Sequence, residues 1–215
     1  MNEGLIHMKD VTVALVDSGI NYEDNFFLKH VKGGKTFIGG EAETYMDDNG
    51  HGSLCASAII KENPNVKLYV EKVLDKDNQS TLDILEESLE ALLDQDIQII
   101  SLSLTLTEIQ RERKLGRICA DLSKKGKIIV CTLANGIDKS YPANYQSTIG
   151  VKGLILENPN AFWFNRRKRI QAIVDTNPYL LRNNNNSYQL FGKCNSFSTA
   201  KFAGILSRIM RQNEI

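Results

Sequence analysis

Residues 11–19 read VTVALVDSG, a nearly continuous apolar run that leads directly into an aspartate, a serine and a glycine. Such a run is typical of a strand that is covered on both faces, as in a parallel sheet. Asp17 then lies at the carboxyl end of the strand, where open α/β sheets place their ligands and catalytic groups. An aspartate before a glycine is by itself better explained as a turn residue, so a functional role for Asp17 depends on its partners.

Similar apolar runs recur along the chain and alternate with helical patterns. Strands are expected at 33–40, 67–73, 97–105, 127–133 and 147–152, and helices after His51 and at 82–93, 108–125 and 196–209. The sequence STLD at 80–83 has the form of a capping box for the second of these helices. The alternation predicts one α/β domain over residues 1–215, with a mostly parallel central sheet flanked by helices and joined by right-handed crossovers.

Residues 161–164 (AFWF) and 170–174 (IQAIV) predict a hairpin whose turn carries the basic run RRKR at 166–169. A solvated hairpin tip is the commoner use of such a turn, and a grip for an acidic peptide is the alternative. A polar loop is expected at 183–186. Both interpretations of the basic turn stay open.

Composition excludes several classes of protein. Lys+Arg and Asp+Glu both count 26, so no net charge indicates nucleic acid or a membrane surface as a partner. No apolar run is long enough to span a bilayer, and the first ten residues lack a secretion signal. Four cysteines without a CxxC pair, all in apolar segments expected to be buried, indicate a reduced, cytoplasmic protein. The oligomeric state is left open.

The sequence NGHGS at 49–53 presents a histidine between two glycines, whose missing side chains leave the imidazole uncovered. A histidine that acts as a general base needs a carboxylate on one ring nitrogen and a nucleophile on the other. Asp17 and Ser196, at the start of a helix rich in small residues, are the candidates. A structural histidine after a polar turn is the alternative, and the two partners favour the base.

The order Asp17, His51, Ser196 along the chain resembles that of the subtilisin-like serine proteases, whereas other triad proteases use different orders. Three stretches carry the resemblance: residues 13–20 (VALVDSGI), 49–53 (NGHGS) and 195–204 (NSFSTAKFAG). The resemblance implies a subtilisin-like fold and serine endopeptidase activity. The chain departs from the family pattern at Ser53 for Thr, at Cys194 and Asn195 before the serine, and at 200–201 after it. It is also short, and with about ten residues before the first strand a long folding prodomain is not expected.

The resemblance also implies a role for each residue. Ser196 attacks the peptide carbonyl, His51 takes its proton, and Asp17 fixes the tautomer of His51. Asn135, in the sequence ANG at 134–136, matches the asparagine that stabilises the oxyanion, although a plain turn residue is the alternative. The amide of Ser196 is the second donor. The substrate is expected to add as a strand along Ser103, Leu104 and Thr105, where Thr105 replaces a glycine and narrows the groove.

These residues predict a cytoplasmic serine endopeptidase of the subtilisin type. Because a compact protease inside its own cell should not digest proteins broadly, the expected task is selective, such as leader removal from a ribosomally made precursor peptide. A general intracellular protease and a pseudoprotease that binds peptides without cutting are the alternatives. No cofactor and no catalytic metal are expected; a structural calcium is possible, but no site for it can be assigned.

The thiol of Cys55 is expected next to the imidazole of His51. Cys55 follows His51 by four residues, so a helix places both on one face. Some subtilisin relatives with a cysteine there are sensitive to mercurials, so the resemblance implies that a bulky adduct on Cys55 displaces His51. Cys194, two residues before Ser196, is the competing target.

Overall fold

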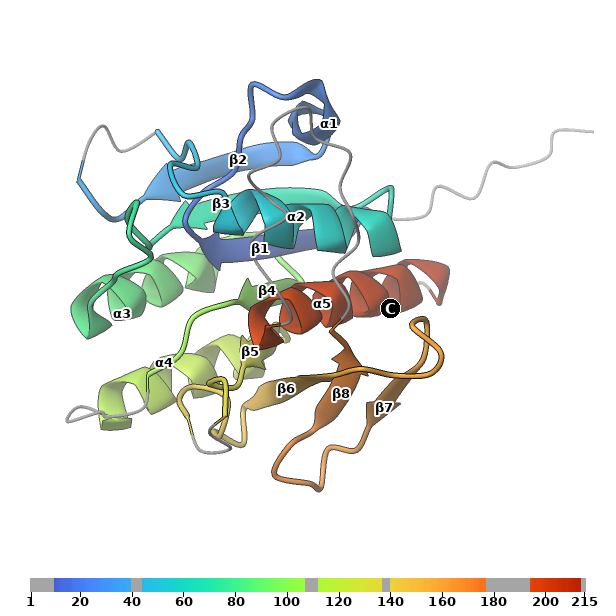
Figure 1. Ribbon diagram of the computed structural model, residues 1–215. Coiled ribbons are helices and arrows are strands. Elements are labelled where there is room, and N and C mark those ends of the chain that lie inside the picture. The colour runs from blue at the N-terminus through green and yellow to red at the C-terminus, as the bar shows by residue number, and fades with distance from the viewer. Residues whose placement is uncertain (1–9, 40–43, 107–111, 137–139, 177–193, 214–215) are drawn as a thin grey trace, which may run out of the picture.

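The computed structural model describes residues 10–39, 44–106, 112–136, 140–176 and 194–213 (Figure 1). Within these ranges the strands form one sheet in the order β2-β3-β1-β4-β5-β6-β8-β7. All neighbouring strands pair in parallel except β7, which runs antiparallel to β8. The strands are β1 Thr12–Asp17, β2 Val31–Thr36, β3 Lys67–Lys72, β4 Ile99–Leu102, β5 Ile128–Thr132, β6 Thr148–Leu154, β7 Phe162–Phe164 and β8 Ala172–Asp175.

Helices cover both faces of this sheet. Helices α2 and α5 pack against each other on one face, and α3 and α4 lie on the other (Figure 1). The helices are α1 Asn25–Leu28, α2 His51–Glu62, α3 Leu82–Ala91, the 3₁₀ turn η1 Leu92–Asp94, α4 Glu112–Lys124 and α5 Asn195–Gln212. The predicted α/β fold with a mostly parallel sheet is therefore confirmed. In the described ranges, no helix combines the length and the apolar character that crossing a bilayer requires.

Strand β1 lies at the centre of the core. Val13 and Leu15 enter the apolar cluster beneath α2 and α5, whereas Ala14 and Val16 enter the cluster beneath α3 and α4. All four side chains are fully buried. Burying a side chain the size of valine or leucine stabilises the fold by about 1.5–3 kcal/mol, which explains why the run is apolar at every position.

Several predicted boundaries were wrong. The cap of α3 is Thr81 and not Ser80, since the Thr81 hydroxyl accepts the amide of Ile84 at 3.2 Å. Strand β2 begins and ends earlier than the expected 33–40. Strand β4 ends at Leu102, because the chain beyond it leaves the sheet and Leu106 pairs with Tyr141 instead.

The hairpin of β7 and β8 forms as predicted. Helix α5 extends to both sides of the expected 196–209. Helix α4 begins at residue 112; the expected start of this helix at 108 and the polar loop at 183–186 lie outside the described residues.

Candidate active site

Asp17 and His51 come together at the carboxyl end of β1. Asp17 is fully buried as the last residue of the strand, and His51 is the first residue of α2. His51 Nδ1 lies 2.7 Å from Asp17 Oδ1. The helix starts this close to the strand because position 52 is a glycine: a Cβ at Gly52 would overlap the carbonyl oxygen of Gly19. The predicted pairing of a carboxylate with the imidazole is thus present in the structure.

Asp47 holds the start of α2 in place, a role that was not predicted from the sequence. Its carboxylate accepts the amides of Gly50 at 2.7 Å and Ser53 at 2.8 Å. It also accepts the hydroxyl of Ser18 at 2.9 Å, and Ser18 in turn accepts the amide of Gly52 at 2.9 Å. Burial would raise the pKa of Asp47, but these hydrogen bonds outweigh it and lower the pKa. An acidic residue just before a helix start was the available signal, since carboxylates stabilise helix N-termini.

The electrostatic surroundings of His51 favour its protonated form. Burial works to lower the pKa of the imidazole and is the largest single effect, but the charges of Asp17 and Cys55 and the hydrogen bonds of Asp17 and Cys194 together outweigh it. The net result is a pKa far above the ordinary value of 6.5. The imidazolium that forms when a base accepts a proton is therefore stabilised in this site.

Ser196 is the second residue of α5, and the strand register brings it to the same edge of the sheet. Val16 pairs with Leu102, so Asp17 and Ser103 leave the sheet side by side. The Ser196 hydroxyl donates to the main-chain carbonyl of Ser103 at 3.0 Å. The hydrogen bonds among the described residues do not include one between Ser196 Oγ and His51. In this structure His51 is hydrogen-bonded to Asp17, whereas the Ser196 hydroxyl is hydrogen-bonded to Ser103 at the end of β4.

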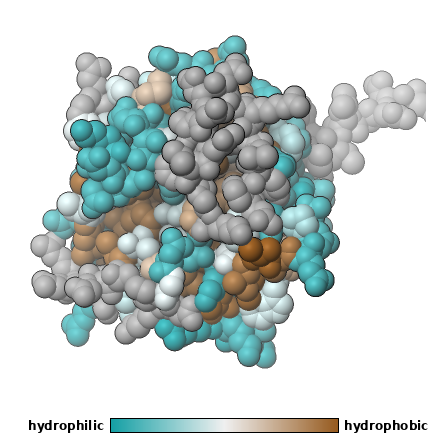
Figure 2. All heavy atoms as spheres, viewed as in Figure 1, coloured by the Kyte–Doolittle hydropathy of each residue, from teal (hydrophilic) through white to brown (hydrophobic). Residues whose placement is uncertain are grey.

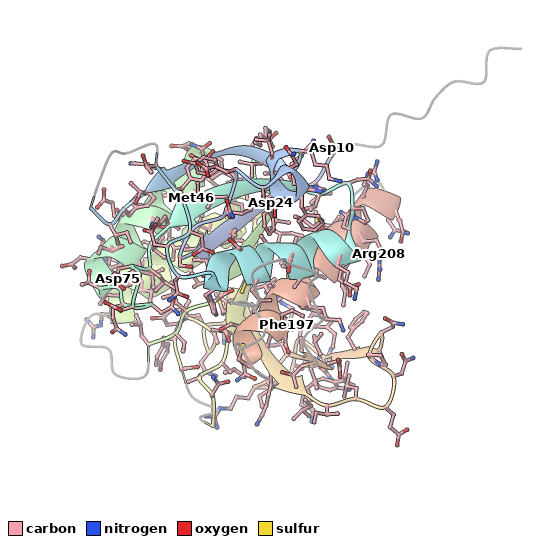
Figure 3. The ribbon with its side chains drawn as sticks, turned by 45° about the horizontal axis from the view of Figure 1, so that its top comes forward. Asp10, Asp24, Met46, Asp75, Phe197 and Arg208 are labelled. Carbon is pink, nitrogen blue, oxygen red and sulfur yellow. The ribbon has the colours of Figure 1, made fainter. Side chains whose placement is uncertain are left out.

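Small residues let α5 pass close to α2. A Cβ at Gly204 would come within 2.8 Å of the Ile59 carbonyl oxygen, so glycine is needed where the helices cross. Phe197, directly after Ser196, is buried at the start of α5 next to α2 (Figure 3). This packing fixes the direction in which α5 presents its first turn.

Asn195 ties the nucleophile helix to the sheet. Its side-chain amide donates to the Leu133 carbonyl at 2.8 Å, and its Oδ1 accepts the amide of Gly153 at 2.8 Å. Its own amide donates to Oδ1 of the exposed Asn135 at 3.3 Å. From the sequence, Asn195 was recognised only as a departure from the family pattern, whereas it joins the ends of β5 and β6 to α5. The structure also brings Asn135 next to the residue that precedes Ser196.

The expected substrate edge follows β4. Ser103 and Leu104 are buried, and Thr105 is partly exposed. The Thr105 hydroxyl donates to the Tyr141 carbonyl at 3.3 Å, which directs its side chain toward the neighbouring segment. All seven predicted site residues therefore lie at the carboxyl edge of the sheet, on the ends of β1, α2, β4, β5 and α5.

Comparison with known proteins agrees with this arrangement. The profile of the subtilase family matches residues 8–215. The chain belongs to the subtilase family. This subtilase is 26% identical over 186 residues to the major intracellular serine protease of Bacillus subtilis (strain 168), which covers 77% of this chain and 58% of that protein. It is 27% identical over 168 residues to subtilisin E of the same strain, which covers 71% of this chain and 43% of that protein. The subtilase thus spans about half the length of these relatives.

Solved structures share the fold at lower sequence identity. A structure described as a lanthipeptide protease matches with a TM-score of 0.75 and 17% identity, over 95% of this chain and 74% of that one. Sphericase matches with a TM-score of 0.78 and 18% identity, over 96% and 79%. At this level of identity the similarity concerns the fold alone.

Two thiols of this subtilase flank His51. Cys55 Sγ lies 4.0 Å from His51 Nδ1, and burial raises the pKa of this thiol to about 11. Cys194 is partly exposed, so the prediction that all four cysteines are buried was wrong for this one. Burial would raise the pKa of Cys194, but the hydrogen bond with His51 and those with the amides of Phe197 and Ser196 lower it.

One cluster in the described part of this subtilase could hold a metal ion. Ligand atoms of Asp17, His51 and Cys55 lie within 4.8 Å of one another. Nitrogen and sulfur ligands suit zinc, whereas calcium takes oxygen ligands, so this cluster does not provide the structural calcium site that the sequence left possible. The hydrogen bond between Asp17 Oδ1 and His51 Nδ1 occupies one potential ligand atom of each of these two residues.

Proposed function

We propose that this subtilase is a serine endopeptidase that acts through Asp17, His51, Ser196 and Asn135, without a cofactor. The 2.7 Å bond between Asp17 and His51, at the strand edge where α5 presents Ser196, carries this proposal. A base that is oriented by a carboxylate and lies beside a hydroxyl is the arrangement that acyl transfer requires. The family to which the chain belongs supports the same activity.

The proposed reaction begins when an extended peptide pairs with Ser103, Leu104 and Thr105. Its amide competes for the Ser103 carbonyl and releases the Ser196 hydroxyl toward His51. His51 accepts the proton at Nε2 while the serine oxygen bonds to the substrate carbon and the carbonyl electrons move to oxygen. The side-chain amide of Asn135 and the main-chain amide of Ser196 donate to that oxyanion.

The second half of the reaction reverses the proton transfers. His51 gives its proton to the leaving amine as the carbon–nitrogen bond breaks, which leaves an acyl ester on Ser196. His51 then takes a proton from water as the water oxygen bonds to the ester carbon. It returns that proton to Ser196 as the bond between the acyl carbon and the serine oxygen breaks and the acid product leaves. The buried carboxylate of Asp17 stabilises the imidazolium in both halves.

We further propose that cleavage is selective, as in leader removal from a ribosomally made precursor peptide, and takes place in the cytoplasm. Thr105 at a position that the family fills with glycine supports a restricted groove. The fold similarity to a protein described as a lanthipeptide protease and the relative named as an intracellular protease support the substrate class and the compartment. The expected partner is a peptide substrate, with neither nucleic acid nor membrane.

A peptide-binding pseudoprotease is the second candidate. The observation that favours it is the Ser196 hydroxyl on the Ser103 carbonyl, since a serine that never reaches His51 would bind peptides without cutting them. In structures without substrate, catalytic hydrogen bonds are often long or unmade, and this accounts for the same observation.

A fluorophosphonate probe separates the two candidates, because it labels only an activated serine. We expect the wild-type protein to be labelled and the Ser196→Ala and His51→Ala variants to stay unlabelled with unchanged circular dichroism spectra. An unlabelled but folded wild-type protein would identify a pseudoprotease. Digestion of a peptide library, read by mass spectrometry, then tests selectivity: we expect a narrow set of cleaved sites, and cleavage throughout the library would indicate a general protease.

A further inference from the structure

Strand β7 is an unusual sheet edge. It is the last strand of the sheet, and its three residues Phe162, Trp163 and Phe164 are 41%, 42% and 44% exposed. The surface over β7 and β8 is correspondingly apolar (Figure 2). Edge strands are normally protected by charged residues, proline or a covering element, because their free main-chain groups pair with other strands. Among the described residues no strand pairs with the outer side of β7, and a row of exposed aromatic residues on such an edge indicates an interaction site.

The aromatic residues of β7 connect this edge to the nucleophile helix. Phe162 and Phe164 point to the same face of the sheet, and their rings lie 5.7 and 5.9 Å from the ring of Phe202 on α5. Trp163 alternates to the opposite face. Phe202 follows Ser196 by six residues, a distance of about 9 Å along a helix. The aromatic rings of β7 therefore contact α5 at a point about 9 Å along the helix axis from Ser196.

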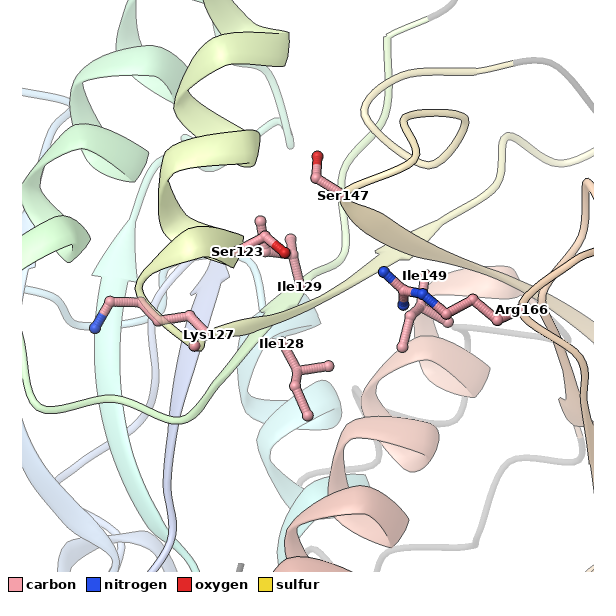
Figure 4. Close-up of a pocket in the computed structure, with 8 residues that line it drawn as sticks. Ser123, Lys127, Ile128, Ile129, Ser147, Ile149 and Arg166 are labelled. Atoms are coloured by element: carbon pink, nitrogen blue, oxygen red, sulfur yellow. The ribbon is translucent and has the colours of Figure 1, made fainter.

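The turn that follows β7 is strongly basic. Arg166 lies over a hollow at the amino ends of β5 and β6, where its guanidinium donates to the Gln146 carbonyl at 3.3 Å (Figure 4). Arg167, Lys168 and Arg169 are exposed, and none of them takes part in the ion pairs found among the described residues. Arg166 thus anchors the turn, while its three neighbours present positive charge to solvent.

We propose that β7 and residues 166–169 form an exosite for an acidic, apolar segment of the peptide substrate, outside the bond that is cut. The apolar part of the segment adds to β7 as a strand and covers the aromatic rings, and its acidic residues contact the basic turn. Because a strand rises about 3.3 Å per residue, acidic residues within roughly four positions of the apolar run come opposite the turn. The identification of the ligand as the peptide substrate rests on the proposed function. The positive charge of residues 166–169 selects acidic residues in the ligand, and the exposed aromatic edge of β7 selects apolar ones.

Fluorescence anisotropy tests binding without requiring cleavage. The protein is the full chain with Ser196→Ala, and the probe is a fluorescein-labelled peptide in which a run of Val, Ile and Phe precedes a run of Asp and Glu. Matched peptides carry Lys in place of the acidic residues, or Gly and Ser in place of the apolar ones. We expect only the first peptide to bind, and more weakly at high salt, because salt screens exposed charges.

Two variants locate the site. Trp163→Ser and the double change Arg167→Glu with Lys168→Glu should each weaken binding by about tenfold or more. Lys29→Glu with Lys32→Glu, two exposed lysines just before and within β2 at the opposite edge of the sheet, is the control and should bind as before. Circular dichroism establishes that each variant is folded.

Three results would overturn the proposal: no binding of the acidic apolar peptide, equal binding of its lysine counterpart, or equal loss in the control pair. A dimer in sedimentation experiments that Trp163→Ser abolishes would assign β7 to a second copy of the chain instead. Failure of the proposed function is a separate result, since it appears as missing fluorophosphonate labelling while anisotropy still reports peptide binding.

Discussion

The two sides of the candidate active site are built differently. On the base side, the carboxylates of Asp17 and Asp47 organise the start of α2 through a dense set of short hydrogen bonds. On the nucleophile side, the neutral side chain of Asn195 joins α5 to the sheet, and the Ser196 hydroxyl is held by a carbonyl.

This difference has a physical consequence. Hydrogen bonds to an ionised group are roughly twice as strong as those between neutral groups, so the base side is positioned before substrate arrives. The nucleophile side completes the triad only when the Ser196 hydroxyl leaves the Ser103 carbonyl and turns toward His51. We therefore expect substitutions on the base side to change the ionisation of His51 and the stability of the fold as well as the rate, and those on the nucleophile side to change the rate of the chemical step alone.

Asp17→Asn, on the base side, should have the largest effect on turnover. The amide cannot hold the same tautomer of His51, so kcat should fall by about 10⁴-fold, the scale seen in other triad proteases. Asp17 also holds the pKa of His51 above 6.5, and the base must be neutral to act. The acidic limb of kcat/KM against pH should therefore lie above pH 6.5 in the wild type and move to lower pH in the variant. An unchanged limb would mean that Asp17 does not set the ionisation of His51.

Asn135→Ala tests the nucleophile side. Loss of this donor should lower kcat by about 10²–10³-fold with little change in KM, because the oxyanion exists mainly in the transition state. Steady-state kinetics at saturating peptide measures both constants. If kcat is unchanged, the side-chain donor to the oxyanion lies elsewhere.

Asp47→Asn tests the stability of the base side. Replacing the carboxylate weakens its charged hydrogen bonds to Ser18, Gly50 and Ser53, which should cost about 1–3 kcal/mol in the free energy of unfolding. Because the pKa of Asp47 is lowered in the folded state, this stabilisation is present above the unfolded value of 3.8 and is lost as the pH falls through the folded value. Urea unfolding at neutral and acid pH should show a difference from the wild type that shrinks in acid. Asp77→Asn, at an exposed site, is the control and should unfold like the wild type at both pH values.

The thiols should give the smallest change in turnover. Cys194→Ala and Cys55→Ala should each retain kcat within a fewfold, since neither thiol has a role in the reaction. Iodoacetamide should inactivate the wild type and the Cys55 variant but spare the Cys194 variant. The reason is that thiolates react, and hydrogen bonds lower the pKa of Cys194 while burial raises that of Cys55. If only the Cys55 variant became resistant, Cys55 rather than Cys194 would be the thiol whose modification inactivates the enzyme. Inactivation by a mercurial adduct on Cys55 stays a prediction.

The sequence by itself determined the fold class and the pairing of the base. The apolar run of β1, buried on both faces, predicts a parallel sheet, and the order of Asp17, His51 and Ser196 predicts the family. These features are local: a run of residues, a pair of glycines, a short motif. Local patterns are enough because burial on two faces and close backbone approach restrict which residue types fit.

Only the tertiary structure decided how distant segments meet. In the sequence, Asp47 and Asn195 look like ordinary polar residues. Their roles arise because β1, β4, β5 and β6 are parallel and in register, so that the chain leaves all four strands at the same edge of the sheet. The position of the Ser196 hydroxyl, the exposure of Cys194 and the free aromatic edge of β7 likewise depend on packing between elements far apart in the chain. No periodicity encodes such contacts, because each depends on the three-dimensional distance between side chains rather than on their spacing in the sequence.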